Sequence, residues 1–176
     1  LDAGPGRKEN MTRETMLAVV DYARRSRFDV IDITGGAPEL NSHVETLVVQ
    51  MAALAPRVMF RSNLSALNSA KGEGLMQVLK DNRVVVVASL PSLNASQTES
   101  QRGKGIFNIS IDTLLKLNRL GYGKEGSGLE LNLVSNPSGA FMPAPQDQAE
   151  VRFRRILGKN WGICFNNLFS FANVPL

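Results

Sequence analysis

The sequence contains very little cysteine and histidine, with one residue of each, Cys164 and His43. A single thiol excludes an internal disulfide framework and any site that needs several thiolate ligands. Cys164 stands in the apolar run Gly-Ile-Cys-Phe, so we expect it to be a small buried hydrophobe. His43 falls at the first turn of an expected helix, where a surface or capping role is expected instead of a ligand or base.

Long apolar runs and concentrated charge are missing as well. No segment approaches the ~18 consecutive apolar residues of a membrane span, and no charged-then-apolar stretch opens the printed sequence. The 20 Lys and Arg residues are scattered among 16 Asp and Glu residues, which gives a net charge of +4. Nucleic-acid binding is therefore not indicated. With 43% hydrophobic residues, residues 1–176 suit a single soluble domain, which we expect to be a fragment of a longer chain.

The stretch from Phe28 to Asn41 carries the strongest local signal. Residues 29–34 alternate polar and β-branched side chains, as a strand does, and Gly35 and Gly36 then end the pattern. Two glycines allow a tight turn and let a ligand approach the main chain without meeting a Cβ. The carboxyl end of a strand is where α/β folds form ligand sites. A glycine turn here is also ordinary connection chemistry, so the residues alone leave both interpretations open.

Helical and strand patterns alternate along the rest of the chain. The unbroken β-branched run of residues 84–88 is typical of a strand covered on both faces. The polar segment 94–104 is long for a simple connection, so we expect a loop that acts as a lid. The patterns predict helices over 12–27, 43–54, 74–80, 107–120 and 148–157, and strands over 29–34, 57–61, 84–88, 129–134 and 163–169. This alternation predicts parallel pairing with right-handed crossovers.

Polar or glycine residues follow the carboxyl ends of four successive predicted strands. In an α/β barrel these positions converge on one rim. We therefore expect a partial TIM-type (β/α) barrel with parallel strands and outer helices, although five strands also fit an open sheet. The rim positions are Gly35-Gly36, Asn63, Ser89 and Asn136. Polar residues at strand ends are common in turns, so a pocket and plain turn chemistry both stay open.

Several short motifs stand in register along the chain. In order and spacing they resemble the arsenosugar-biosynthesis type of radical S-adenosylmethionine protein, also described as a radical SAM protein with a cysteine-rich C-terminal domain. The resemblance covers essentially the whole chain. The motifs are residues 2–5 (Asp-Ala-Gly-Pro), 32–41 (Asp-Ile-Thr-Gly-Gly-Ala-Pro-Glu-Leu-Asn), 61–64 (Arg-Ser-Asn-Leu), 88–91 (Ala-Ser-Leu-Pro), 101–105 (Gln-Arg-Gly-Lys-Gly) and 131–137 (Leu-Asn-Leu-Val-Ser-Asn-Pro).

The resemblance implies S-adenosylmethionine and a [4Fe-4S] cluster at the carboxyl rim, a small-molecule substrate, an electron donor and a reducing compartment such as the cytoplasm or a plastid. Gly35, Gly36, Pro38 and Glu39 would occupy the Gly-Gly-Glu-Pro element, whose backbone receives the methionyl amino group. Arg102 would pair with a carboxylate or an anionic substrate. Contacts to the ribose and carboxylate are implied for Asn63, Ser89, Asn132 and Asn136.

The chain departs from the family at its cysteines. Radical SAM chemistry requires a Cys-x3-Cys-x2-Cys loop, which in relatives lies immediately before the motif of residues 2–5. Relatives also tend to carry cysteine where Ser62 and Ser92 stand, and their cysteine-rich part would follow Pro175. The chain is therefore either a fragment whose cluster ligands lie elsewhere or a non-catalytic structural subunit of a larger assembly. As given, we expect it to bind no iron and to cleave no S-adenosylmethionine.

Overall fold

A computed structural model describes residues 9–136 and 145–170 of the chain. Over these residues five strands form one sheet in the order β1-β2-β3-β4-β5, and every neighbouring pair is parallel. The strands are β1 Val30–Ile33, β2 Arg57–Ser62, β3 Val85–Ser89, β4 Leu131–Ser135 and β5 Asn167–Ser170. Consecutive order with parallel pairing is the arrangement of successive units in a (β/α) barrel. The predicted α/β fold is confirmed.

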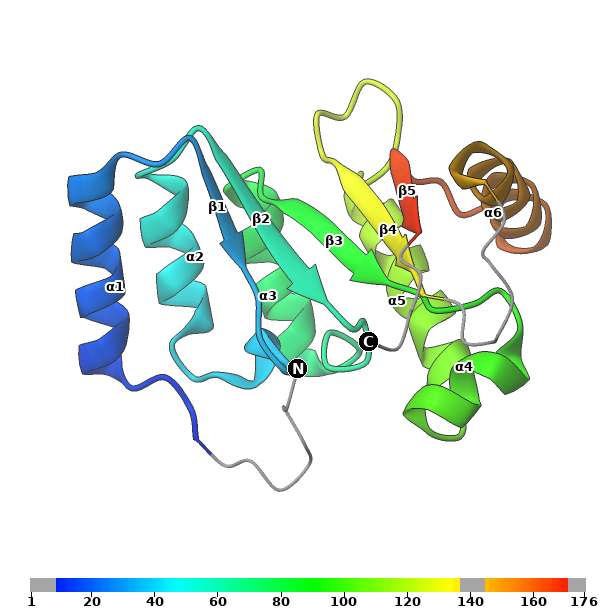
Figure 1. The fold of residues 1–176 in the computed structure, drawn as a ribbon, viewed down its shortest axis with the longest axis horizontal. Helices are drawn as coiled ribbons and strands as arrows, with labels where there is room; N and C mark the ends of the chain where they lie inside the picture. Colours follow the sequence, from blue (N-terminus) through cyan, green and yellow to red (C-terminus); the bar gives the residue numbers. More distant parts are fainter. Residues whose placement is uncertain (1–8, 137–144, 171–176) are drawn as a thin grey trace.

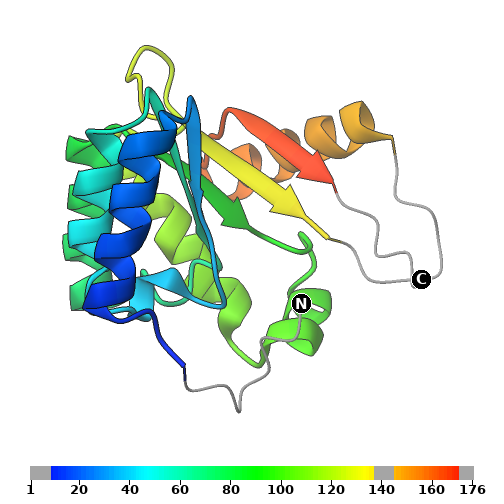
Figure 2. The same cartoon turned by 60° about the vertical axis from the view of Figure 1, so that its left-hand side comes forward.

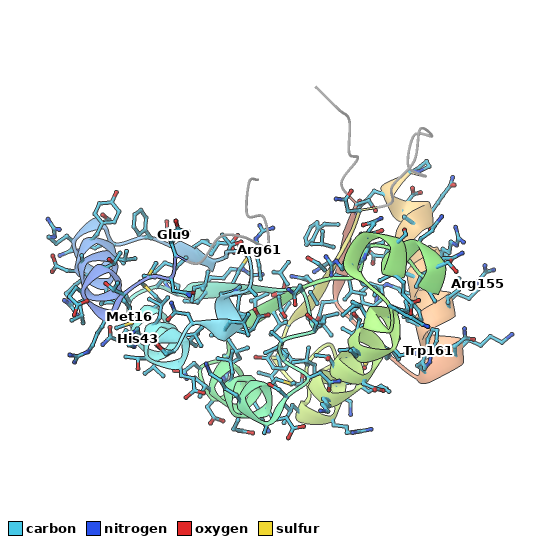
Figure 3. All side chains as sticks on the ribbon, turned by 90° about the horizontal axis from the view of Figure 1, so that it is seen from below. Glu9, Met16, His43, Arg61, Arg155 and Trp161 are labelled. Atoms are coloured by element: carbon cyan, nitrogen blue, oxygen red, sulfur yellow. The ribbon has the colours of Figure 1, made fainter. Side chains whose placement is uncertain are left out.

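The helices follow the strands in alternation (Figure 1). Seen at other angles, α1, α2, α3 and α5 lie on the same side of the sheet (Figures 2 and 3), and successive members of this row contact one another. All the helices of the described residues are α1 Arg13–Ser26, the 3-10 helix η1 Pro38–Leu40, α2 Val44–Ala52, α3 Ala70–Asp81, α4 Ala95–Arg102, α5 Ile106–Leu120 and α6 Gln146–Trp161. None of them is long and apolar enough to cross a bilayer.

The core lies between the sheet and this row of helices. Alternate strand residues point toward the helices, so Phe60, Val86 and Leu133 are completely buried there. Leu79 of α3 and Leu114 of α5 belong to the same buried cluster. Burying side chains of this size stabilises the fold by roughly 1.5–3 kcal/mol each. The core therefore fixes the sheet and places the strand ends at one edge.

The opposite face of the sheet carries a polar network instead of a packed core. Arg61 of β2 forms a two-point contact with Asp32 of β1, with N–O distances of 2.8 and 3.1 Å. Arg57 donates to both carboxylate oxygens of Glu130 at 2.8 Å, across β3. Figure 3 shows Arg61 on the side of the sheet away from α2 and α3. This face corresponds to the interior of a closed barrel.

Local capping signals explain several element boundaries. The side chain of Ser69 accepts a hydrogen bond from the Gly72 amide, so α3 begins at Ala70 and not at the predicted residue 74. His43 occupies the N-cap position of α2 but makes no side-chain capping bond. The predicted segments 1–6 and 137–139 lie outside the described residues.

The predicted loop over 94–104 is wrong, because residues 95–102 form α4. Asn94 caps this helix by accepting from the Gln97 amide at 3.3 Å. Only Thr98 of the helix is buried, so its sequence lacks the apolar stripe from which helices are predicted. A capped helix in this position does not support the expectation of a loop that acts as a lid.

The last predicted strand also differs from the observed one. It begins at Asn167 instead of residue 163, and Cys164 lies before it. Cys164 is half-buried, not fully buried as predicted. Its backbone is held by Asn118, which accepts from the Cys164 amide and donates to its carbonyl, both at 2.9 Å. These side-chain bonds replace the ladder bonds that a longer strand would make at this point.

Candidate functional site

The carboxyl ends of β1, β2 and β3 lie at the same edge of the sheet. The arrowheads of these strands point toward the end at which α4 lies (Figure 1). Gly35 and Gly36 follow β1, Asn63 follows β2, and Ser89 ends β3. The parallel register therefore brings three of the predicted rim positions to one edge.

A pocket of about 320 Å³ opens at this edge. Its lining comes from the turn after β1, the turn after β2, the end of α4 and the start of α5. The lining residues are Gly36, Asn63, Ser65, Arg102 and Ile106. Three of the five, Gly36, Asn63 and Arg102, are residues that the sequence predicted for the site.

Arg102 joins the elements around the pocket. Its Nη1 donates to the carbonyl of Ser89 at 2.8 Å and to the carbonyl of Asn63 at 3.4 Å. The side chain is half-buried, and this burial lowers the pKa of the Arg102 guanidinium from its ordinary value. An arginine guanidinium is effectively always protonated in proteins, so the group stays charged at neutral pH.

No carboxylate of the described residues forms an ion pair with Arg102. The guanidinium has five N–H groups, and the two hydrogen bonds to carbonyls use only Nη1. Among the described residues, no carboxylate pairs with the rest of its fork, and carboxylates and phosphates are the groups that arginine binds with two parallel hydrogen bonds. Chemically, the pocket is suited to an anionic group.

The turn after β2 is held by several side chains. Asn63 Oδ1 accepts from both the amide and the hydroxyl of Ser65, at 3.1 and 2.9 Å. Leu64 has a φ of 72° and is completely buried. A left-handed conformation of this kind costs a residue with a Cβ about 1–2 kcal/mol. Ser62 Oγ accepts from the Leu64 amide at 2.9 Å, and Thr113 Oγ1 donates to the Leu64 carbonyl at 3.1 Å.

The turn after β1 connects to the same region through Glu39. Pro38 opens η1, and Glu39, the next residue, is only 3% exposed. Its Oε1 accepts a hydrogen bond from Ser62 Oγ, whereas its Oε2 has no hydrogen-bond partner among residues 9–136 and 145–170. Burial raises the pKa of the Glu39 carboxyl, and the Ser62 hydrogen bond opposes that rise. The side chain of Glu39 therefore points into the protein toward β2.

Six of the nine predicted site residues are not among those that line the pocket: Gly35, Pro38, Glu39, Ser89, Asn132 and Asn136. Asn132 is inside β4, where it is 3% exposed, donates to Glu130 and accepts from Asn167, both at 2.8 Å. Asn136 follows β4, and its main-chain N–H donates to the Pro91 carbonyl at 3.3 Å. Neither residue lines the pocket. Their roles as ribose and carboxylate contacts stay predictions.

Sequence reasoning missed Ser65, Ile106 and Thr113. Ser65 follows the motif of residues 61–64, and the short side-chain contact between Asn63 and Ser65 is a pattern typical of turns. Thr113 lies in the middle of α5, 49 positions from its partner Leu64. No local pattern could reveal a contact over that distance.

Another depression lies on α6 and shares no lining residue with the rim pocket. It is lined by Asp147, Gln148, Val151, Arg152 and Arg155. Arg155 points outward on this helix (Figure 3). Among the described residues, no group of three or more His, Cys, Asp or Glu side chains is arranged to hold a metal ion.

Comparison with known proteins gives a match in fold. A comparison with protein-family models finds none that matches, and a comparison with curated proteins finds none either. Among solved structures, the chain is similar to Streptococcus suis SuiB bound to S-adenosylmethionine, with a TM-score of 0.68 and 11% sequence identity. The match covers 97% of this chain and 36% of that chain. The chain therefore has the fold of about a third of SuiB.

Proposed function

We propose that this chain is the S-adenosylmethionine-binding core of a radical SAM enzyme of the arsenosugar-biosynthesis type. In the full-length protein this core would take part in reductive cleavage of S-adenosylmethionine to a 5′-deoxyadenosyl radical. The observation that carries the proposal is the guanidinium of Arg102 in the rim pocket, charged and without a carboxylate partner among the described residues. The fold similarity to a protein bound to S-adenosylmethionine supports it.

The residues of the pocket suit the methionyl end of S-adenosylmethionine. Its carboxylate needs a cationic or N–H donor, which Arg102 offers, and its ammonium needs acceptor oxygens. Main-chain carbonyls in the turn after β1 can supply these acceptors. A Cβ added at Gly35 would meet no other heavy atom within 4 Å, so the backbone there is open to close approach. The chain's own part is therefore to bind and orient the methionyl group.

An iron-sulfur cluster does not fit the residues of this chain. A cluster of the [4Fe-4S] type is held by cysteine thiolates, and the sequence has only Cys164. That residue is 128 positions from Gly36 and is fixed beside Asn118 through its backbone. The ligands for radical chemistry would have to come from outside these 176 residues.

A direct test is calorimetric titration of S-adenosylmethionine into the chain and into its Gly36→Val variant. A β-branched side chain at residue 36 obstructs backbone approach, so we expect the variant to bind at least about tenfold more weakly. Gly158→Val is the matched control, because Gly158 lies on α6 with open space around it. Equal affinity of wild type and Gly36→Val would remove the role proposed for this turn.

A second candidate function is a non-catalytic structural subunit. It is favoured by β1, which pairs with only one other strand among the described residues and leaves Val30 48% exposed. Phe28 beside it is 39% exposed and contacts Tyr22, which is 58% exposed, with the two ring planes tilted by 57°. Exposed edges and apolar groups of this kind are normally covered by a partner. A chain that sediments as a cooperatively folded monomer would count against this candidate.

A further inference from the structure

The buried carboxyl of Glu39 begins a continuous chain of hydrogen bonds to the pocket. Glu39 Oε1 accepts from Ser62 Oγ, and Ser62 Oγ in turn accepts from the amide of Leu64 at 2.9 Å. That amide belongs to the peptide group between Asn63 and Leu64. The carbonyl of the same peptide group accepts from Arg102 Nη1 at 3.4 Å. One peptide group is therefore bonded at its N–H end toward Glu39 and at its C=O end to Arg102.

The planarity of the peptide bond makes this connection rigid. Because the N–H and C=O of one peptide group share a plane, fixing the direction of the Leu64 amide also fixes the direction of the Asn63 carbonyl. The φ of 72° at Leu64 is unfavourable for a residue with a Cβ, so the turn keeps this geometry only while its surroundings hold it. The Ser62 hydroxyl accepts from the amide of Leu64, and the Thr113 hydroxyl donates to the carbonyl of Leu64 at 3.1 Å, so both sides of the residue are held.

We propose that Glu39 and Thr113 are positioning residues, which hold the strained turn at Leu64 so that the Asn63 carbonyl anchors Arg102 in the rim pocket. The side chain of Glu39 then contacts no ligand. It orients the Ser62 hydroxyl, which would otherwise be free to rotate and donate elsewhere. The inference rests on the proposed function for the identity of the ligand, whereas the positioning of the turn stands on the contacts themselves.

Isosteric and truncating substitutions separate this role from a general contribution to stability. Glu39→Gln keeps the acceptor oxygen for Ser62, so we expect its affinity for S-adenosylmethionine to stay within about twofold of wild type. Glu39→Ala and Thr113→Val each release one side of the turn, and we expect each to weaken binding about tenfold or more. Affinities are measured by calorimetry on the full chain, alongside the thermal midpoint of each variant.

Tyr122→Phe is the matched control for lost stability. It removes a buried hydrogen bond of 2.9 Å to the Val84 carbonyl, before the amino end of β3 and away from the pocket. We expect it to lower the thermal midpoint and to leave affinity unchanged. If Tyr122→Phe weakens binding as much as Glu39→Ala, the effect is one of stability and the positioning role is wrong.

Amide hydrogen exchange tests the positioning role without any ligand. The Leu64 amide should be protected in wild type and in Glu39→Gln, and its exchange should be about tenfold faster or more in Glu39→Ala. A wild-type chain that binds no S-adenosylmethionine but shows this exchange pattern would contradict the proposed function and support the positioning role. Equal Leu64 exchange in wild type and Glu39→Ala, or equal affinity in the two, would overturn the positioning role.

Discussion

Replacing Arg102 with alanine removes the one charged side chain among the described residues that line the pocket. The half-buried guanidinium already has Nη1 fixed on the carbonyls of Ser89 and Asn63, so little of its freedom is left to lose when an anion binds. A hydrogen-bonded contact between charged groups is worth about 1.5–3 kcal/mol. We therefore expect the dissociation constant for S-adenosylmethionine to rise roughly 10- to 150-fold in Arg102→Ala.

Two further variants sharpen this experiment. Arg102→Lys keeps the charge but loses the planar fork, so it cannot hold both carbonyls and a carboxylate at once. The affinity of Arg102→Lys for S-adenosylmethionine should therefore fall between that of wild type and that of Arg102→Ala. Arg155→Ala removes an exposed arginine from the depression on α6 and should bind like wild type. The assay is calorimetric titration at fixed ionic strength, because exposed charges are screened by salt. Affinity within twofold of wild type in Arg102→Ala would refute the carboxylate-binding role.

The remaining predictions concern the turn at Gly123, the carboxyl of Glu39 and iron. Gly123 has a φ of 73°, and a Cβ there would lie 2.5 Å from the Cys164 carbonyl oxygen, so Gly123→Ala should lower the free energy of unfolding by about 2–4 kcal/mol in chemical denaturation. Gly126→Ala, with a φ of 72° but open space, should lose only about 1–2 kcal/mol, and equal losses would contradict the clash. Burial raises the pKa of Glu39 in the folded chain, so the stability of wild type relative to Glu39→Gln should be greatest below the ordinary glutamate pKa. This stability difference should decline as the pH rises through the raised pKa of Glu39 in the folded chain, and a difference that grows with pH would contradict the prediction. Anaerobic reconstitution with iron and sulfide should leave the chain without thiolate-to-iron absorption, and stoichiometric cluster assembly would show that its ligands have been misjudged.

Much of the fold could be predicted because the chain's local patterns agree with its tertiary structure. The β-branched run that forms β3 is buried throughout residues 85–88, as a continuous apolar run predicts, although α1, α2, α3 and α5 all lie on one side of the sheet. The alternation of strands and helices predicted the parallel sheet correctly. Helix α4 was missed because it buries only Thr98 and is specified by the Asn94 cap instead of by an apolar stripe.

The candidate site was predictable only at the level of strand ends. The register of β1, β2 and β3 places Gly36, Asn63 and Ser89 at one edge, which the order of the motifs indicated. What the sequence could not predict is that Arg102 uses main-chain carbonyls as its anchors. Every residue type has a main-chain carbonyl, so the sequence does not indicate which residues accept such hydrogen bonds. Their geometry depends on the strained Leu64 turn, which only the folded chain reveals.

Asn132 is a predicted binding residue that does not line the rim pocket. Its motif resembled a binding segment, yet the pleat of β4 directs the side chain to the polar face of the sheet, beside Asn167. Its amide is already engaged by Glu130 and Asn167. Strand alternation predicts which face a residue occupies relative to its neighbours, but the distance from the rim depends on where the strand ends.

The most direct test of the central claim is a nuclear magnetic resonance titration of the labelled chain with S-adenosylmethionine. We predict that the largest shift changes occur at the amides of Gly35, Gly36 and Asn63 and at the Nε–H of Arg102. The amides around Val151 on α6 should stay unchanged, because that depression shares no lining residue with the rim pocket. An absence of changes at the rim, or changes centred on α6, would contradict the assignment of the rim pocket as the binding site.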